Sequence, residues 1–334
     1  MRPFKYVRAS DLDAAALAVA ANPRAKYLAG GTNLLDLMKE DIERPNELVD
    51  LNRLQLNEIK PLAEIKPSGD GVSIGALATN TDTANHPLIR QGYPLLTQAI
   101  VAGASPQLRN MATNGGNLLQ RTRCPYFYDT ALPCNKREPG TGCAAREGLN
   151  RMHAIFGWSE KCVATYPGDM ANALYALDAE VRIKGAGGRE RTIPIGEFHR
   201  LPGDTPEKDT DLEHGDLIVA IELPGSPFAK NFHYLKVRDR ASYAFALVAV
   251  AAALELDGGT IRQARVVLGG VAHKPWRSRE AEAALAGKPA SEESFRRAAE
   301  AALLEAKPLA HNAFKVELGK RAIVRALLRA SRLA

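Results

Sequence analysis

The sequence lacks the motifs by which the commonest nucleotide-binding and hydrolytic enzymes are identified. No G-x-G-x-x-G opens a helix after a strand and no G-x4-G-K-[ST] is present, which argues against a Rossmann dehydrogenase and a P-loop NTPase. The G-x-S-x-G turn of the α/β-hydrolases is missing too. No close pair of carboxylates stands out as an acid–base couple. The chemistry of the chain must therefore lie in other patterns.

Long apolar runs and long runs of one charge are also missing. Asp11 and Asp13 interrupt the apolar character of residues 1–23, so we expect no signal peptide on this chain. The alanine-rich run 244–254 is too short to span a bilayer, so no membrane insertion is expected. The net charge is +6, but no five basic residues follow one another, so nucleic acid is not an expected partner. A basic face toward an acidic subunit or an anionic cofactor fits this charge equally well.

Cysteine is scarce and is confined to one window. The four cysteines Cys124, Cys134, Cys143 and Cys162 are separated by nine, eight and eighteen residues, and the rest of the 334-residue chain has none. The segment 120–166 is rich in glycine, proline and charge and shows no sustained period of 2 or 3.6. A long irregular insert in a chain of otherwise globular composition is usually disordered or functional. A cross-link through the four thiols would give it order.

Four interpretations of the cysteines compete. Four inert buried thiols would not explain why the other positions carry none. Disulfides are a second interpretation, although a chain of this size has enough core to fold without them. Structural zinc favours short C-x2-4-C spacings, which are absent. A [4Fe–4S] cluster accepts thiolates from widely spaced loop positions, and we favour it while zinc or disulfides stay open. His153 lies in the window and is a candidate to replace one thiolate, although such a histidine is more often a satisfied polar side chain.

The first fifty residues alternate between strand and helix patterns. Strands are predicted at 4–7, 26–29 and 47–51, with a helix capped by Ser10 and another at 34–38. The order predicts an α/β or α+β fold. The turn Gly30-Gly31-Thr32-Asn33 lies between a strand and a helix, where glycine leaves backbone N–H groups uncovered and the helix adds positive potential. It suits a pyrophosphate, and equally an ordinary tight turn with Asn33 as the helix cap.

A second turn of small residues follows at 110–118, where hydroxyl and amide side chains flank Gly115 and Gly116. Two such turns favour an anionic ligand of dinucleotide size held by backbone amides. Asp169 is predicted to cap a helix at 170–177 and could equally accept hydrogen bonds from a ribose.

Pro224-Gly225-Ser226-Pro227 is the best candidate for a domain boundary. Beyond it we predict strands at 232–237 and 261–268, an apolar segment at 244–256, and amphipathic helices near 291–306 and 312–332. The predicted domains are residues 1–225, with the insert at about 120–166, and residues 228–334.

Four segments taken together resemble the FAD-binding subunits of the xanthine dehydrogenase and molybdenum hydroxylase family. They are Ala29-Gly30-Gly31-Thr32-Asn33-Leu34-Leu35, Thr113-Asn114-Gly115-Gly116-Asn117-Leu118, Tyr166-Pro167-Gly168-Asp169-Met170 and Lys236-Val237-Arg238-Asp239-Arg240. The resemblance covers nearly the full length. The cysteine insert, which most of the family lacks, is similar to that of the flavin subunits of bacterial periplasmic aldehyde oxidoreductases, which carry an additional [4Fe–4S] cluster.

The resemblance implies an α+β fold: a two-lobed FAD-binding domain of the vanillyl-alcohol-oxidase type, followed by a C-terminal domain like that of carbon monoxide dehydrogenase flavoproteins. It implies that no residue of this chain is catalytic and that the metal ligands are the four cysteines. The implied FAD contacts are Ala29, Gly30, Gly31, Thr32, Asn33, Leu34, Leu35, Thr113, Asn114, Gly115, Gly116, Asn117, Asp169 and Lys236. Tyr166 and Gly168 depart from the His and Ser that the family commonly has at these positions.

The resemblance also implies a heterotrimer with a large molybdenum-cofactor subunit and a small subunit that holds two [2Fe–2S] clusters. Electrons from an aldehyde, oxidised to a carboxylic acid on the large subunit, would pass through the small subunit to FAD on this chain and then to an external acceptor. A flavin subunit of a xanthine or other N-heterocycle dehydrogenase is the alternative within the family, and a zinc-stabilised binding protein without a redox role is the alternative outside it. Export to the periplasm with a signal-bearing partner is expected, with the cytoplasm as the alternative.

Overall fold

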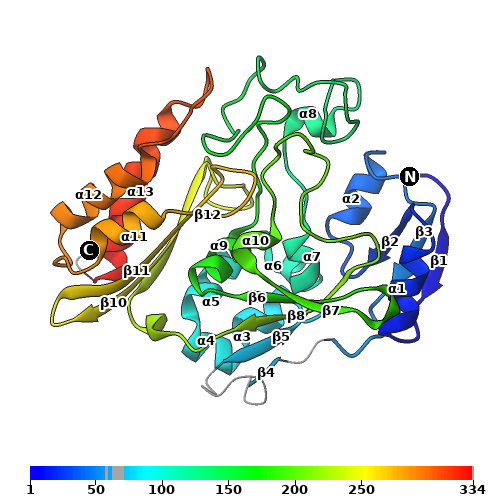
Figure 1. The fold of residues 1–334 in the computed structure, drawn as a ribbon, viewed down its shortest axis with the longest axis horizontal. Helices are drawn as coiled ribbons and strands as arrows, with labels where there is room; N and C mark the ends of the chain where they lie inside the picture. Colours follow the sequence, from blue (N-terminus) through cyan, green and yellow to red (C-terminus); the bar gives the residue numbers. More distant parts are fainter. Residues whose placement is uncertain (57–58, 62–70, 333–334) are drawn as a thin grey trace.

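The structure is a computed structural model that describes residues 1–56, 59–61 and 71–332. Three sheets form three parts that lie side by side (Figure 1). The first lobe is a parallel sheet of order β1-β3-β2, in which each connection between strands passes through a helix or a turn. Asp11, rather than the expected Ser10, caps the first helix by accepting a hydrogen bond from the Ala14 amide at 2.7 Å. The elements of this lobe are β1 (Lys5–Arg8), α1 (Leu12–Ala20), β2 (Ala25–Leu28), α2 (Leu34–Lys39) and β3 (Glu47–Asp50).

The second lobe is built on an antiparallel five-stranded sheet of order β4-β5-β8-β6-β7. Residues 80–92 form two short helices rather than one, because Pro87 begins a new helix after His86. The strands are β4 (Ile59–Pro61), β5 (Val72–Gly75), β6 (Glu180–Lys184), β7 (Glu190–Pro194) and β8 (Leu217–Leu223). The helices are α3 (Asn80–Asn85), α4 (Pro87–Gly92), α5 (Pro94–Ala102), α6 (Pro106–Arg109), α7 (Asn114–Leu118), α9 (Asp169–Ala176) and α10 (Ile195–Phe198).

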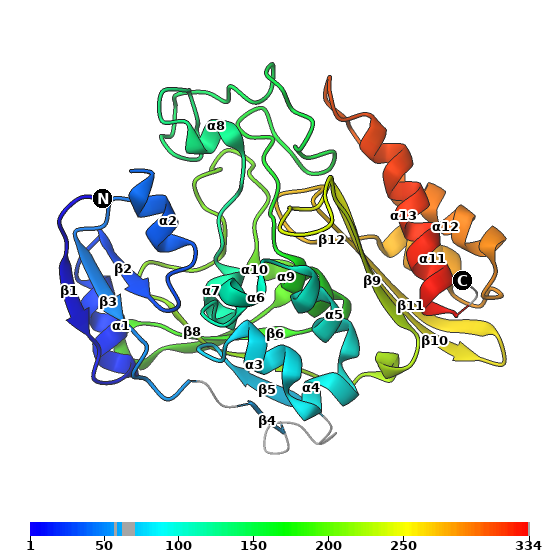
Figure 2. The same cartoon turned by 180° about the vertical axis from the view of Figure 1, so that it is seen from behind.

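The C-terminal part is an antiparallel sheet of order β12-β11-β10-β9 that is covered on both faces. Helix α13 packs on one face, and α5 and α9 of the second lobe pack on the other (Figures 1 and 2). The residues of β10 from Val248 to Leu254 are therefore buried whichever face they point to, which explains an apolar run without alternation. The elements are β9 (Phe232–Val237), β10 (Val248–Asp257), β11 (Thr260–Gly269), β12 (Trp276–Arg277), α11 (Arg279–Leu285), α12 (Glu292–Leu303) and α13 (Phe314–Ala330).

The cysteine insert is the irregular segment that rises above the lobes at the top of Figure 1, and its helix is α8 (Pro125–Tyr128). Hydrogen bonds fasten it to the C-terminal part. The buried Nζ of Lys315 donates to the carbonyls of Met152, His153 and Gly270 at 3.1, 2.9 and 2.8 Å. The Trp158 indole donates to the Lys307 carbonyl at 2.7 Å. The insert therefore has a defined path despite its lack of regular structure.

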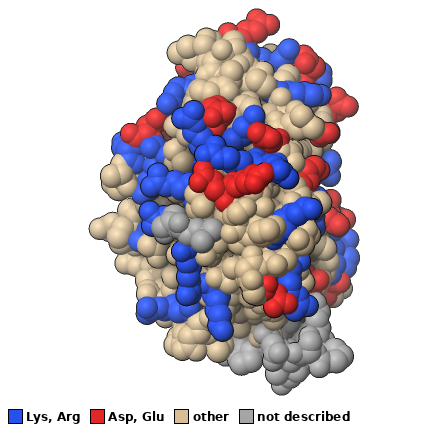
Figure 3. Space-filling model, turned by 90° about the vertical axis from the view of Figure 1, so that its left-hand side faces the viewer, with Lys and Arg blue, Asp and Glu red and all other residues tan. Residues whose placement is uncertain are grey.

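Charge is mixed on the face that Figure 3 shows, where lysine and arginine lie among aspartate and glutamate. Helices α12 and α13 contribute i,i+4 pairs such as Arg321–Glu317, whose N···O distance is 2.8 Å. No helix within the described ranges is both long enough and apolar enough to cross a bilayer.

Candidate cofactor sites

The two glycine segments predicted from the sequence touch each other. A Cβ atom on Gly30 would lie 1.8 Å from the carbonyl oxygen of Met111, so only glycine fits here. The adjacent Gly31 has φ +73°, a left-handed conformation that glycine adopts without strain. The turn after β2 is therefore pressed against the backbone that enters α7.

The first turn presents hydrogen-bond donors that other groups leave free. Within the described part of the chain, no backbone hydrogen bond engages the N–H groups of Gly31, Thr32 and Asn33. The side-chain Nδ2 of Asn33 is buried and also has no partner there. Buried donors without partners are rare in native proteins and call for a ligand or water. An anion is the ligand that several converging N–H groups favour.

The second segment is a short helix rather than the open turn expected from its glycines. Thr113 caps α7 by accepting a hydrogen bond from the Gly116 amide at 3.3 Å. The amides of Asn114 and Gly115 donate to the carbonyls of Ala78 and Ala76 at 3.0 and 2.8 Å. This segment therefore supplies a rigid wall, and the free amides belong to the first turn.

Two hollows meet at the paired segments. One lies on the side of the first lobe and has a volume of about 1420 Å³, and the other lies on the side of α5, α9 and β9 and has a volume of about 2150 Å³, both counted with the open space at their mouths. They share the stretch Gly30 to Asn33, together with Gly116 and Gln120. Every residue of the predicted nucleotide set lines one or both hollows except Asn114, which is fully buried and bonds to Asn80 and Thr83. The arrangement suits a ligand with two bulky ends and an anionic middle.

The second hollow contains a buried ion pair. Lys236 donates to the Asp169 carboxylate at 2.7 Å, and their side chains are only 5% and 8% exposed. The Tyr234 hydroxyl donates to the other Asp169 oxygen at 2.7 Å. Asp169 is the first residue of α9, and its side chain does not cap that helix. The two residues predicted from separate segments are thus brought into contact.

Arg121 connects the first turn to the cysteine insert, a link the sequence did not reveal. Its backbone N–H donates to Asn33 Oδ1 at 3.0 Å, and its guanidinium donates to Glu43 and Asp209 at 2.7 and 2.9 Å. Asp209 also accepts from Lys136, which is buried in the insert. Burial by itself would raise the pKa of the Asp209 carboxyl, but Lys136 and Arg121 hold that pKa below its usual range.

The four cysteines lie together around one small hollow of about 250 Å³. They belong to a cluster of buried side chains that includes Phe127, and all four are free thiols, so no disulfide is formed. Cys134 and Cys143 face each other across a backbone bridge. No three His, Cys, Asp or Glu side chains in the described ranges converge as a single metal ion requires. The hollow therefore gathers four sulfurs without forming a single-ion site.

The surroundings of the sulfurs decide their protonation. Burial raises the pKa of the Cys124 thiol to about 12. The interaction between the neighbouring thiols of Cys143 and Cys162 lowers the pKa of Cys143 to about 6 and, together with burial, raises that of Cys162. A bound cation is what would keep all four sulfurs as thiolates in this apolar setting.

The family is shown by comparison with known proteins. The family described as the FAD binding domain in molybdopterin dehydrogenase matches residues 2–226, and the CO dehydrogenase flavoprotein C-terminal domain matches residues 233–330. The aldehyde oxidoreductase FAD-binding subunit PaoB of Escherichia coli K12 is 50% identical over 99% of both chains. The chain belongs to the FAD-binding subunits of the molybdenum hydroxylases. It is thus a subunit of an oxidoreductase.

Two further relatives also match most of the chain. The putative xanthine dehydrogenase FAD-binding subunit XdhB of Escherichia coli K12 is 28% identical over 91% of this chain and 86% of its own. The crystal structure of quinoline 2-oxidoreductase from Pseudomonas putida 86 contains a chain that is 25% identical, with a TM-score of 0.75 and coverage of 100% and 98%. The α+β fold expected from the sequence is thereby confirmed.

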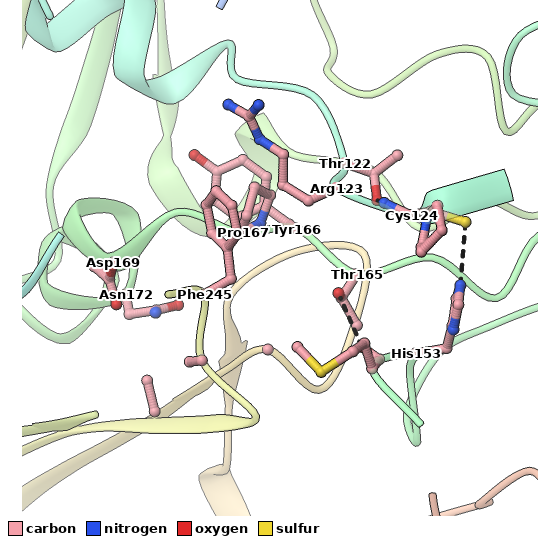
Figure 4. Close-up of a pocket in the computed structure, with 15 residues that line it drawn as sticks. Thr122, Arg123, Cys124, His153, Thr165, Tyr166, Pro167, Asp169, Asn172 and Phe245 are labelled. Atoms are coloured by element: carbon pink, nitrogen blue, oxygen red, sulfur yellow. Dashed lines mark hydrogen bonds between the residues drawn. The ribbon is translucent and has the colours of Figure 1, made fainter. Parts of the chain in front are cut away.

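In this FAD-binding subunit a third, mainly apolar hollow lies between the cysteines and the second hollow (Figure 4). Cys124 and His153 line one end of it, and Asp169 and Phe245 line the other. His153 Nε2 lies 3.1 Å from Cys124 Sγ, so this histidine stands beside a thiol. His273 stands in the same way 3.2 Å from Cys162 Sγ. His273 lies outside the cysteine window, and no motif in the sequence marks it.

Proposed function

We propose that this chain is the FAD-binding electron-transfer subunit of a heterotrimeric, molybdenum-dependent aldehyde oxidoreductase. The contact between the first glycine turn and the α7 segment, with free amides where two hollows meet, is the observation that carries the FAD assignment. The amides of Gly31, Thr32 and Asn33 would hold the pyrophosphate, and Asn33 Nδ2 would add a further donor. The rest of the predicted set would line the two ends of the dinucleotide.

The bound flavin accepts and releases electrons, and the chain supplies its position and electrostatic setting. Lys236 and Asp169 neutralise each other in the second hollow, and Tyr234 keeps the carboxylate oriented. Arg121 fastens the first turn to the loop that carries Asp209. These contacts fix the position of the turn. In this proposal, the parts before and after about residue 226 are separate domains, and α5 and α9 pack against β9 and β10 between them.

A [4Fe–4S] cluster held in the cysteine hollow would be the second cofactor. Cys124, Cys134, Cys143 and Cys162 are free, gathered and mostly buried. A single zinc ion would need donors that converge on one point, and no such group occurs in the described residues. A cluster accepts thiolates that are farther apart. The pKa of Cys162 is raised by its hydrogen bond with Cys143 and by burial, and the charge of the buried Lys136 opposes this rise; the same charge would offset part of the negative charge of the site.

The partners and the substrate are inferred from similarity. Identity of 50% over nearly the whole chain to an aldehyde oxidoreductase subunit supports an aldehyde substrate, whereas identity to the xanthine dehydrogenase subunit is 28%. A large molybdenum-cofactor subunit and a small subunit with two [2Fe–2S] clusters would complete the complex, and an external acceptor would take the electrons. The periplasm, reached by export with a signal-bearing partner, is the proposed location.

Cofactor analysis and a substrate panel on the purified complex test this proposal. Flavin absorption, FAD released on denaturation, and iron with acid-labile sulfide in excess of what the small subunit carries are the expected results. A colourless chain with bound zinc would exclude the redox function. A panel of aldehydes and N-heterocycles then tests the substrate class, with reduction of a dye acceptor as the readout. Turnover of xanthine without turnover of any aldehyde would favour the xanthine dehydrogenase alternative.

A further inference from the structure

Two histidines contact sulfurs of the cysteine hollow from different parts of the chain. We propose that His153 and His273 are positioning residues that donate N–H···S hydrogen bonds to Cys124 and Cys162 and so favour the reduced state of the cluster. This inference rests on the proposed [4Fe–4S] cluster. The nitrogen–sulfur distances are 3.1 Å for His153 Nε2 and 3.2 Å for His273 Nε2. Both fall within hydrogen-bond reach of a sulfur acceptor.

The two rings are fixed by their surroundings. His153 and His273 are 2% and 7% exposed, so neither ring is free to turn toward water. His153 belongs to the insert, whereas His273 follows β11 in the C-terminal domain, 111 residues after Cys162. Figure 4 shows the His153 ring pointing at the Cys124 sulfur along the hydrogen bond. Two of the four sulfurs that line the hollow are therefore contacted by histidines from separate parts of the chain.

The other ring nitrogen identifies the donor. Nδ1 of both His153 and His273 is buried and, among the described residues, has no hydrogen-bond partner. A proton on Nδ1 would be a buried donor without an acceptor, which costs about 1–3 kcal/mol. Unpaired buried N–H groups are rarer than unpaired acceptors. The proton of each ring therefore belongs on Nε2, which makes each sulfur the acceptor.

A sulfur that accepts such a bond is better described as a thiolate than as a thiol. A thiol sulfur is a weak acceptor, whereas a thiolate bound to iron carries negative charge. The charge on the sulfurs increases when the cluster is reduced, and the N–H···S bonds strengthen with it. Hydrogen bonds to cluster sulfurs are among the factors that set the reduction potential. The same geometry makes His153 a donor beside Cys124 and not a replacement for a cysteine ligand.

Variants of the two histidines in the assembled complex test the inference. His153→Leu and His273→Leu remove the donor, whereas His153→Gln and His273→Gln are matched variants that keep an N–H group. Each Leu variant should lower the midpoint potential of the cluster, with a change of about tenfold in the ratio of reduced to oxidised cluster, equivalent to about 59 mV for one electron. The Gln variants should recover most of this shift, and the flavin potential should stay constant. Unchanged cluster potentials in the Leu variants would overturn the inference.

A measurement on the unmodified protein keeps the test decisive if a variant loses its cluster. Pulsed electron paramagnetic resonance of the reduced cluster should detect a weakly coupled nitrogen and an exchangeable proton. Strong coupling from a directly bound nitrogen would make a histidine a ligand and overturn the inference, as would the absence of any nitrogen coupling. Unmodified protein without iron on this chain would overturn the proposed cluster itself. Iron present with unaffected potentials would overturn only the role of the histidines.

Discussion

The ring of Tyr166 occupies the space that a side chain at Gly168 would need. A Cβ atom on Gly168 would lie 2.4 Å from Cε1 of Tyr166 and 2.5 Å from its hydroxyl oxygen. That hydroxyl donates to the carbonyls of Asn117 and Leu118 at 3.2 and 3.3 Å. The two departures from the expected family residues are therefore one structural feature. Tyr166 ties the segment before α9 to the α7 segment, and Gly168 leaves room for it.

We predict that Gly168→Ser destabilises the protein by about 1–3 kcal/mol, as overpacking of a buried site does. The backbone at Gly168 has φ −81° and ψ 112°, which serine adopts without strain, so the ring of Tyr166 is the obstacle. Thermal unfolding of the variant and of Gly168→Ser combined with Tyr166→His measures the effect. The second change should recover part of the loss, since contacting residues are energetically coupled. Strictly additive effects would mean that the two positions do not interact.

Gly30→Ala should release FAD. The new methyl group would meet the Met111 carbonyl, so the first turn and the α7 segment would have to separate. A displacement that costs about 1–3 kcal/mol weakens binding by roughly 5- to 150-fold. The ratio of flavin to protein after gel filtration is the measurement. Gly92→Ala is the matched control, because nothing lies within 4 Å of a Cβ atom at that position. Equal flavin content in both variants would contradict the proposed pyrophosphate site.

Cys134→Ser should lose most of its cluster iron and loosen the insert, while FAD stays bound. The Ser hydroxyl does not replace a thiolate at iron, whereas the contacts of Lys315 and Trp158 with the insert remain. Iron and labile sulfide per chain, together with limited proteolysis between residues 120 and 166, report the two effects. Full iron content would remove Cys134 from the ligand set. Loss of flavin as well would show that the insert supports the nucleotide site.

The stability contributed by Lys315 should depend on pH. Burial lowers the pKa of Lys315 to about 7, against 10.5 for the ordinary side chain. Between these values the unfolded chain binds a proton that the folded chain has lost, so the free energy of unfolding rises with pH in this window, by up to about 1.4 kcal/mol per unit. Urea unfolding of the wild type and of Lys315→Met is measured at pH 7, 8 and 9. The free energy of unfolding of the wild type should rise relative to that of the variant as the pH increases. Lys320→Met on the same helix controls for the loss of one charge. A constant difference would mean that the three carbonyls keep Lys315 protonated throughout.

The parts of the proposed FAD site and of the cysteine site that can be recognised from the sequence are each local in the chain. Gly30-Gly31-Thr32-Asn33 is one turn, and the four cysteines are the only ones in the chain, so residue type and spacing sufficed to single them out. The contacts that complete these sites are not local. Arg121 is 88 residues from both Asn33 and Asp209, and His273 is 111 residues from Cys162. No spacing rule connects such pairs.

The sequence by itself determined which residues have the chemistry: glycines that allow a close turn, four thiols in one insert, and the order of strands and helices. Only the tertiary structure decided that Gly30 lies against the Met111 carbonyl and that the ring of Tyr166 fills the space beside Gly168. It also placed the rings of His153 and His273 beside cysteine sulfurs. The alanine-rich run of β10 shows the same division: it is a strand because it pairs with β9 and β11, and it is buried because helices cover both faces of that sheet. Local pattern reports the preferences of a segment, whereas packing between distant segments decides what each side chain touches.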